Sequence, residues 1–108
     1  MAREVDLWTF AAAWTAGAVV LDVRESVEYR GAHVSGAHLA PLSALAAALP
    51  RVPEGRTVYV ICAGGNRSQW AAGRLAAAGM DALSVAGGTR GWIGTGRPVV
   101  TGSAPGAV

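Results

Sequence analysis

The sequence has 108 residues, a formal net charge of +2 and a hydrophobic content just above half. These values fit one folded domain with a single core and argue against an intrinsically disordered chain. The strongly basic side chains are all arginines, and they are scattered rather than clustered, so nucleic-acid binding is not expected. A single cysteine excludes an internal disulfide and is typical of a reducing compartment.

The N-terminal segment predicts a helix followed by a buried strand. Asp6 is a suitable N-cap for a helix that continues to about Thr15 and has one apolar face. Residues 18–23 form an apolar run without alternation, which is typical of a strand covered on both faces. Residues 7–21 loosely imitate a signal peptide, but acidic side chains precede them, and they are shorter than the ~20 residues of a membrane span. We therefore expect a cytoplasmic protein that makes no membrane contact.

Polar residues follow this strand, at the sheet edge where open α/β folds place their sites. Asp22 and Arg24 are candidate supporting residues of such a site, or they pair with each other or hold neighbouring loops. Residues 25–30 predict a short helical turn, and residues 32–41 a loop with a short strand near 37–40. The histidines of this loop have no further ligands at metal-site spacing, so we interpret His33 as a hydrogen-bonded structural residue and expect no metal.

The rest of the chain continues the alternation of helices and strands. Residues 42–49 predict a helix, 57–61 a buried strand, 69–78 a helix and 81–86 another strand. A glycine-rich bend at 87–92 is expected to pass close to the loop that begins at residue 62. All four tryptophans are interpreted as core-packing residues. The pattern predicts an α/β fold with a doubly wound, mostly parallel central sheet flanked by helices, formed by residues 1–100, and a flexible tail at 101–108.

The chain's only cysteine opens the loop between the strand at 57–61 and the next helix. Gly64 and Gly65 allow this loop to curl so that its N–H groups converge on an anion. The helix dipole and the charge of Arg67 act in the same direction. These features favour a thiolate, so Cys62 is the candidate catalytic nucleophile. The candidate substrate-binding residues are the rest of the loop: Ala63, Gly64, Gly65, Asn66, Arg67 and Ser68.

Two questions about this loop stay open. Arg67 either binds the substrate or turns away to pair with Glu25 or another carboxylate. The chain holds no second cysteine to discharge an oxidised or persulfidated Cys62, so discharge requires an outside partner.

Short motifs follow one another in a fixed order between about Leu7 and Val100. They are Leu21-Asp-Val-Arg-Glu25, Glu28-Tyr29, His33-Val34, Gly36-Ala37 with Pro41, Val60-Ile-Cys62, Gly65 with Arg67-Ser68, Leu75, Gly79, Gly87-Gly88 and Trp92. Their order and spacing resemble the rhodanese (thiosulfate sulfurtransferase) family in its single-domain form. Ala32 and Ser35 depart from the glycine and proline that are common there, and both lie outside the nucleophile loop.

The resemblance implies a reaction that needs no cofactor. Cys62 would take the outer sulfur of thiosulfate, releasing sulfite, or the sulfur of a persulfide donor. A thiophilic acceptor such as cyanide, a thiol or a sulfur-accepting protein would then remove it. The loop N–H groups and Arg67 would attract the anionic donor and stabilise the departing sulfite.

Two alternatives to this enzyme stay open. Phosphatases and arsenate reductases also surround an anion with a cysteine and an arginine, but the four residues between Cys62 and Arg67 make a shorter loop than theirs. Other rhodanese-like domains serve as non-catalytic or sulfur-relay interaction modules. The non-catalytic ones have typically lost the cysteine that this chain retains.

Overall fold

The centre of the protein is a five-stranded sheet in which every neighbouring pair of strands is parallel. The computed structural model describes residues 3–48, 52 and 55–106. The strand order is β1-β6-β5-β2-β4, with bounds β1 (Arg3–Val5), β2 (Val19–Asp22), β4 (His38–Leu39), β5 (Val58–Ile61) and β6 (Ala82–Val85). The predicted α/β class and parallel sheet are confirmed.

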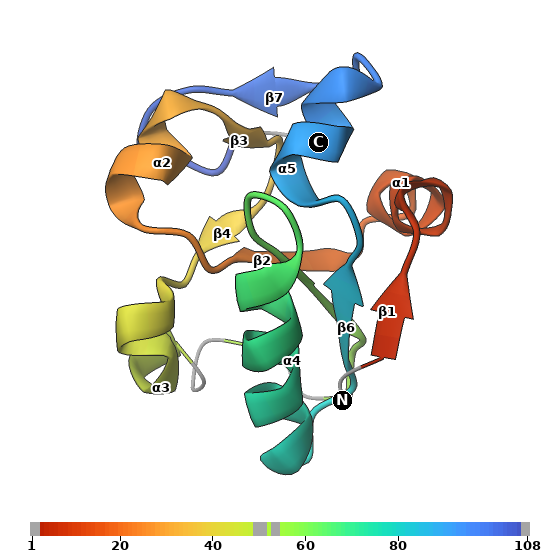
Figure 1. Cartoon of the computed structure of the whole chain (residues 1–108), viewed down its shortest axis with the longest axis vertical. Coiled ribbons are helices and arrows are strands. Elements are labelled where there is room, and N and C mark those ends of the chain that lie inside the picture. Colours follow the sequence, from red (N-terminus) through yellow and green to blue (C-terminus); the bar gives the residue numbers. More distant parts are fainter. Residues whose placement is uncertain (1–2, 49–51, 53–54, 107–108) are drawn as a thin grey trace.

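Helices lie on both faces of this sheet (Figure 1). They are α1 (Leu7–Thr15), α2 (Ser26–Gly31), the 3-10 turn η1 (Leu42–Ala44), α3 (Leu45–Ala48), α4 (Asn66–Ala77) and α5 (Gly88–Gly94). The first helix starts as predicted, because the Asp6 carboxylate accepts a 2.7 Å hydrogen bond from the Thr9 N–H. Helix α4 begins at Asn66, earlier than the predicted Gln69. No helix among the described residues has the length and apolarity to cross a membrane.

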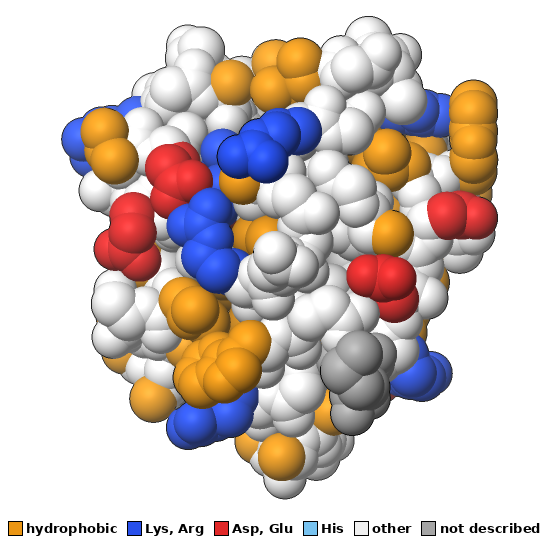
Figure 2. All heavy atoms as spheres, viewed as in Figure 1, with side chains coloured by type: hydrophobic (Ala, Val, Ile, Leu, Met, Phe, Trp, Pro, Cys, Tyr) orange, Lys and Arg blue, Asp and Glu red, His pale blue; other side chains and the backbone are white. Residues whose placement is uncertain are grey.

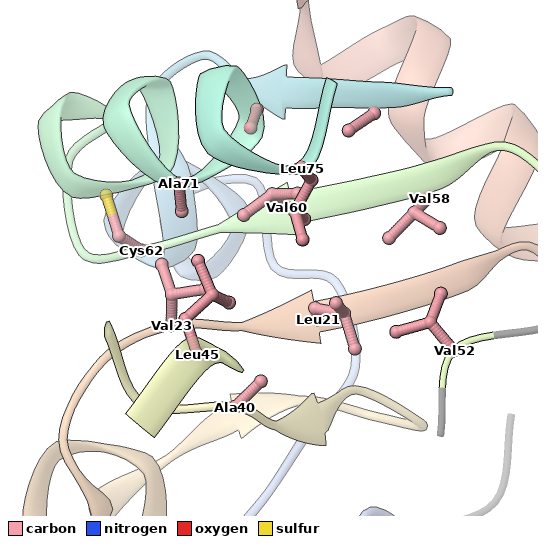
Figure 3. Packing of buried hydrophobic residues seen from close by; sticks show 12 residues of the cluster. Leu21, Val23, Ala40, Leu45, Val52, Val58, Val60, Cys62, Ala71 and Leu75 are labelled. Carbon is pink, nitrogen blue, oxygen red and sulfur yellow. The ribbon is translucent and has the colours of Figure 1, made fainter. Parts of the chain in front are cut away.

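Buried side chains form one apolar cluster on each face of the sheet. The cluster under α3 and α4 is drawn in Figure 3 and contains Leu21, Val23, Ala40, Leu45, Val52, Val58, Val60, Cys62, Ala71, Ala72, Leu75 and Ala82. The cluster under α1 and α5 contains Phe10, Val20, Val34, Ala37, Ile61, Val85 and Trp92. The middle strands therefore contribute side chains to both clusters, which explains why their sequences show no polar alternation.

The expectation that all four tryptophans pack in the core is wrong for two of them. Trp92 is fully buried and contacts Phe10 edge-on, but Trp8 is 72% exposed and Trp70 52% exposed. Trp8 lies two residues before Phe10, so helix geometry places it on the opposite side of α1. There the guanidinium of Arg97 lies over its ring, which is a cation–π contact at a surface site.

A second, two-stranded sheet joins two segments far apart in the sequence. Strand β3 (His33–Val34) pairs antiparallel with β7 (Val99–Val100). Beyond β7 the chain continues along the domain, since the N–H of Gly102 donates to the Arg30 carbonyl (2.9 Å) and the N–H of Gly36 to the Pro105 carbonyl (2.7 Å). The domain boundary at residue 100 and the flexibility of residues 101–108 stay predictions.

His33 has the structural role that the sequence indicated. Its ring is buried between two backbone carbonyls, with Nδ1 2.8 Å from the Tyr29 oxygen and Nε2 2.9 Å from the Ala104 oxygen. The ring also stacks on that of Tyr29. His33 thereby links α2 to the C-terminal segment.

Candidate active site

Cys62 follows β5 directly and lies beneath the first turn of α4. Its side chain is 1% exposed, and Figure 3 shows the sulfur directed toward α4 at the end of the row of buried apolar residues. Gly65 precedes the helix with φ +117°, a backbone conformation that residues with a Cβ rarely adopt. This conformation turns the chain back on itself, so that the Gly65 N–H donates to Cys62 Sγ at 3.1 Å.

Two opposing effects act on the Cys62 thiol. Burial raises its pKa, because low-dielectric surroundings disfavour the charged thiolate. Hydrogen bonds from the Ser68 hydroxyl and from the N–H groups of Ser68, Gly65 and Gly64 lower the pKa by more. The net result is a pKa below the ordinary value of a cysteine. The site therefore favours the nucleophilic form of the sulfur.

The Ser68 hydroxyl is held in place by the interior of the protein. Its Oγ lies 3.4 Å from Cys62 Sγ, 3.1 Å from the Gly65 carbonyl oxygen and 2.8 Å from Ser84 Oγ on β6. Ser68 and Ser84 are both fully buried. In the thiol form the Cys62 S–H donates to the hydroxyl, and in the thiolate form the hydroxyl can rotate and donate to the sulfur.

Arg67 forms a two-point ion pair with a carboxylate of α2. Its Nη1 and Nη2 lie 2.7 and 2.8 Å from Oε1 and Oε2 of Glu28. Of the two alternatives for Arg67, the structure shows pairing with a carboxylate, and the partner is Glu28 rather than Glu25. The hydrogen bond from Arg67 is the main cause that lowers the pKa of Glu28 to about 2. The carboxylate of Glu28 therefore balances the positive charge of Arg67.

Asp22 and Arg24 pair with each other inside the protein, as the sequence allowed. Arg24 Nη2 lies 2.8 Å from Asp22 Oδ2 and its Nε 3.0 Å from Oδ1. Both residues are buried, and Arg24 also donates to the Ala32 carbonyl at 2.8 Å. Next to them, the Val23 N–H donates to the Ile61 carbonyl, which joins the end of β2 to the strand that leads to Cys62. This geometry fits a supporting role and leaves no net charge.

The glycine bend before α5 packs directly on the nucleophile loop, as predicted. Gly88 has φ +57°, and a Cβ there would lie 2.6 Å from the Cys62 carbonyl oxygen and 2.5 Å from that of Ala63. The Thr89 N–H donates to the Cys62 carbonyl (2.8 Å) and the Arg90 N–H to the Ala63 carbonyl (3.1 Å). Only glycine fits at position 88, because the two backbones touch there.

Sequence reasoning missed the two residues that this bend brings to the loop. The Thr89 hydroxyl is buried and has no hydrogen-bond partner among the described residues. The guanidinium Nη1 of Arg90 lies 3.4 Å from where a Cβ on Gly64 would stand. The glycine pair at 87–88 was the available signal for this approach.

The remaining predicted features lie outside this cluster or at its margin. Asn66 is exposed and begins α4. Among the described residues, no group of three His, Cys, Asp or Glu side chains could hold a metal ion. A groove of about 800 Å³ runs along β2 and β4, and no residue of the Cys62 loop lines it.

Comparisons with known proteins agree with this fold. The family model for the rhodanese-like domain matches residues 9–95. A rhodanese-related protein from Thermoplasma volcanium is 32% identical, with a TM-score of 0.85 over 93% of this chain and 99% of that one. A crystal structure of thiosulfate sulfurtransferase from Pseudomonas aeruginosa is 28% identical, with a TM-score of 0.85 over 96% of this chain and 20% of that one.

One curated relative is named as a sulfur carrier rather than as a sulfurtransferase. The Bacillus subtilis protein named "Putative sulfur carrier protein YrkF" is 36% identical over 76 residues, which are 69% of this chain and 41% of that protein. The chain spans less than half the length of the curated relatives it matches, 46% in one case and 41% in the other.

Proposed function

This chain belongs to the rhodanese-like domain family, and from that membership we propose that it is a sulfurtransferase that carries a sulfane sulfur on Cys62. The donor is thiosulfate or a persulfide, and the acceptor is cyanide, a thiol or a sulfur-accepting protein. The observation that carries the proposal is a thiol with a lowered pKa at the end of β5, facing the N–H groups of Gly64, Gly65 and Ser68.

The proposed reaction has two balanced steps. The Cys62 thiolate attacks the outer sulfur of thiosulfate, a new S–S bond forms, and the original S–S bond breaks with its electron pair leaving on sulfite. Cys62 then carries a persulfide anion. Cyanide attacks the terminal sulfur, the persulfide bond breaks, and thiocyanate leaves while the thiolate returns. Neither step needs a general base, because both nucleophile and leaving group are anions.

The surroundings of the sulfur support both steps. The N–H groups that hydrogen-bond to the thiolate are equally suited to hold the terminal sulfur of a persulfide. The absence of a second cysteine in the sequence prevents an internal disulfide from discharging that persulfide. The pairing of Arg67 with Glu28 weakens the case for a phosphatase, since an arginine that binds phosphate in two-point fashion needs its guanidinium free.

Mass measurement on the intact protein tests the proposal. We expect the wild type to gain one sulfur atom on incubation with thiosulfate, to release sulfite in equal amount, and to lose the sulfur to cyanide. Cys62→Ser serves as the matched control and gains no sulfur. A wild type that gains no sulfur from thiosulfate or from a persulfide donor would exclude sulfur transfer.

A second candidate, a sulfur relay to a protein acceptor, is favoured by the relative named as a sulfur carrier. It uses the same Cys62 persulfide and differs in the second step. In a relay, the loaded protein releases its sulfur slowly to cyanide and small thiols. Discharge by small acceptors at rates typical of enzyme turnover would favour the transferase instead.

A further inference from the structure

Arg90 differs from the other arginines of the described structure. The chain has nine arginines, and eight of them lie in the described part. Seven of these eight bind a carboxylate, a hydroxyl, a backbone carbonyl or an aromatic ring: Arg3, Arg24, Arg30, Arg56, Arg67, Arg74 and Arg97. Arg90 is exposed, and within the described residues its guanidinium has no such partner.

The backbone fixes Arg90 beside the nucleophile loop. Its N–H donates to the Ala63 carbonyl at 3.1 Å, one residue after Cys62. Its Nη1 approaches Gly64, which supplies one of the N–H groups that lower the pKa of the Cys62 thiol. A Cβ at position 88 would clash with the carbonyls of Cys62 and Ala63, so the two backbones are in direct contact there. The free guanidinium therefore lies beside the nucleophile loop, next to Gly64.

Two other arginines near the loop are each paired with a carboxylate. Arg67 is paired with Glu28, and Arg24 with Asp22. Figure 2 shows basic side chains in blue on this face, with acidic side chains in red beside them on the α2 side. A donor that carries negative charge must approach a thiolate, which repels it. An unpaired cation beside the loop would offset this repulsion.

We propose that Arg90 is the residue that binds the anionic group of the substrate, and that it selects donors with a negatively charged group over neutral ones. This inference rests on the proposed function for its natural substrate. The contact is a charge-assisted hydrogen bond between the guanidinium and an oxygen of the donor, such as a sulfonate oxygen. Arg67 has a positioning role instead, since it ties α4 to α2.

Alkylation of Cys62 tests the selection without requiring sulfur transfer. Because the chain has one cysteine, every alkylated product reports on Cys62. The rate at which Cys62 reacts with iodoacetate, an anion, or with iodoacetamide, which is neutral, is divided by the rate at which free glutathione reacts with the same reagent. We expect wild type to prefer iodoacetate, and Arg90→Gln to reduce that preference on the order of 10-fold, the usual effect of losing a charge-assisted hydrogen bond. Arg90→Lys should keep part of the preference, because the charge remains without the planar fork.

Two further variants separate Arg90 from general charge effects. Arg74→Gln removes the same charge from the last turn of α4 and should keep the wild-type preference. The double variant Glu28→Gln/Arg67→Gln removes the ion pair without changing the net charge. If the preference falls in this double variant and stays in Arg90→Gln, the anion binds Arg67 and the proposal is overturned. The proposal is also overturned if the ratio of the iodoacetate rate to the iodoacetamide rate is no higher for the wild type than for free glutathione.

The outcome for Arg90 is independent of the outcome for sulfur transfer. A protein that gains no sulfur but loses its iodoacetate preference in Arg90→Gln retains the anion site and lacks the proposed reaction. A protein that transfers sulfur with the same kcat/KM for thiosulfate in wild type and Arg90→Gln retains the reaction and refutes the role of Arg90. If both proposals hold, kcat/KM for thiosulfate falls on the order of 10-fold in Arg90→Gln.

Discussion

The reactivity of Cys62 depends on a few hydrogen bonds that outweigh the effect of burial. A thiol that is 1% exposed in an apolar cluster would ordinarily be inert, because burial raises its pKa. The Ser68 hydroxyl and three backbone N–H groups reverse that effect. The backbone donors come with the loop conformation, whereas the hydroxyl depends on a single side chain. Ser68 is therefore the residue through which this balance can be tested.

We predict that Ser68→Ala raises the pH midpoint of Cys62 alkylation by iodoacetamide. Alkylation follows the thiolate, whose population extends to lower pH when the pKa is low. Removing the hydroxyl takes away one lowering contribution and leaves the burial that raises the pKa. Ser84→Ala is the matched control, because it also removes a buried hydroxyl, but one that contacts Ser68 Oγ and not the sulfur. Equal midpoints in wild type and Ser68→Ala would assign the low pKa to the backbone alone.

At the scale of the elements, one ion pair connects α2 to α4. Glu28 accepts from both terminal nitrogens of Arg67, and its Oε1 also accepts from the Glu25 N–H at 3.2 Å, within the first turn of α2. Arg67 and Glu28 are 37% and 34% exposed, so solvent screens the pair and its contribution is about 1 kcal/mol. The pKa of Glu28 is about 2 in the folded protein and ordinarily 4.5, so the contribution of the ion pair to stability depends on pH.

We predict that wild type and Glu28→Gln converge in stability as pH falls from about 4.5 to about 2. A carboxyl whose pKa is lowered by folding stabilises the folded state above its unfolded pKa, and this stabilisation disappears as the pH falls through its folded pKa. Urea unfolding of both proteins at a series of pH values measures the difference in free energy. Gln keeps an acceptor oxygen for the Glu25 N–H, so helix capping is preserved. A difference that stays constant over this range would contradict the shifted pKa.

The contact between the glycine bend and the nucleophile loop allows a second test at this scale. We predict that Gly88→Ala destabilises the protein by about 2–4 kcal/mol, because its Cβ would lie 2.5 Å from the Ala63 carbonyl oxygen and its φ of +57° is unfavourable for alanine. Gly94→Ala, at the end of the same helix with open space around it, should change stability by less than about 1 kcal/mol. Urea denaturation compares the two. Similar losses in both variants would show that α5 tolerates no alanine for a reason other than this contact.

Elements with a strong local pattern could be predicted from the sequence, and elements that depend on distant pairing could not. The apolar runs of β2, β5 and β6 are visible because both faces of these strands are covered. Strand β1 is a short edge strand with two exposed residues, and β3 and β7 have two residues each, which is too short for periodicity. Residue type alone places Trp8 in the core, whereas its position on α1, two residues before the buried Phe10, places it at the surface.

In the candidate site too, the local features could be predicted from the sequence and the long-range contacts could not. The Cys62 loop is contiguous, so its glycines and its place between a strand and a helix could be recognised in the sequence. The partner of Arg67 is 39 positions away, and nothing local distinguishes Glu28 from Glu25. Arg90 reaches the loop because β5 and β6 are parallel neighbours, so that the turns that follow them meet at one edge of the sheet. Such a contact is a property of the strand order.

Over the whole molecule, the C-terminal segment closes back on residues from the first half of the chain. After β7 pairs with β3, residues 102–106 supply three contacts: Gly102 with the Arg30 carbonyl, Ala104 with His33, and Pro105 with Gly36. His33 and Gly36 lie in the segment that joins α2 to β4, and Arg30 belongs to α2, the helix that carries Glu28. The segment thus supports the side of the domain on which the Arg67 ion pair depends.

We predict that a chain ending at Val100 is less stable than the full chain by about 2–4 kcal/mol, the sum of three hydrogen bonds at about 1 kcal/mol each. Urea unfolding measures the loss, and amide exchange at Gly36 should accelerate because its acceptor, the Pro105 carbonyl, is removed. A chain ending at Gly106 keeps all three contacts and serves as the control. Equal stability in the chains ending at 100 and 106 would instead support a domain that ends at residue 100 with a flexible tail. A loss confined to the shorter chain would extend the folded domain to residue 106, because hydrogen bonds that stabilise the native state must be made within it.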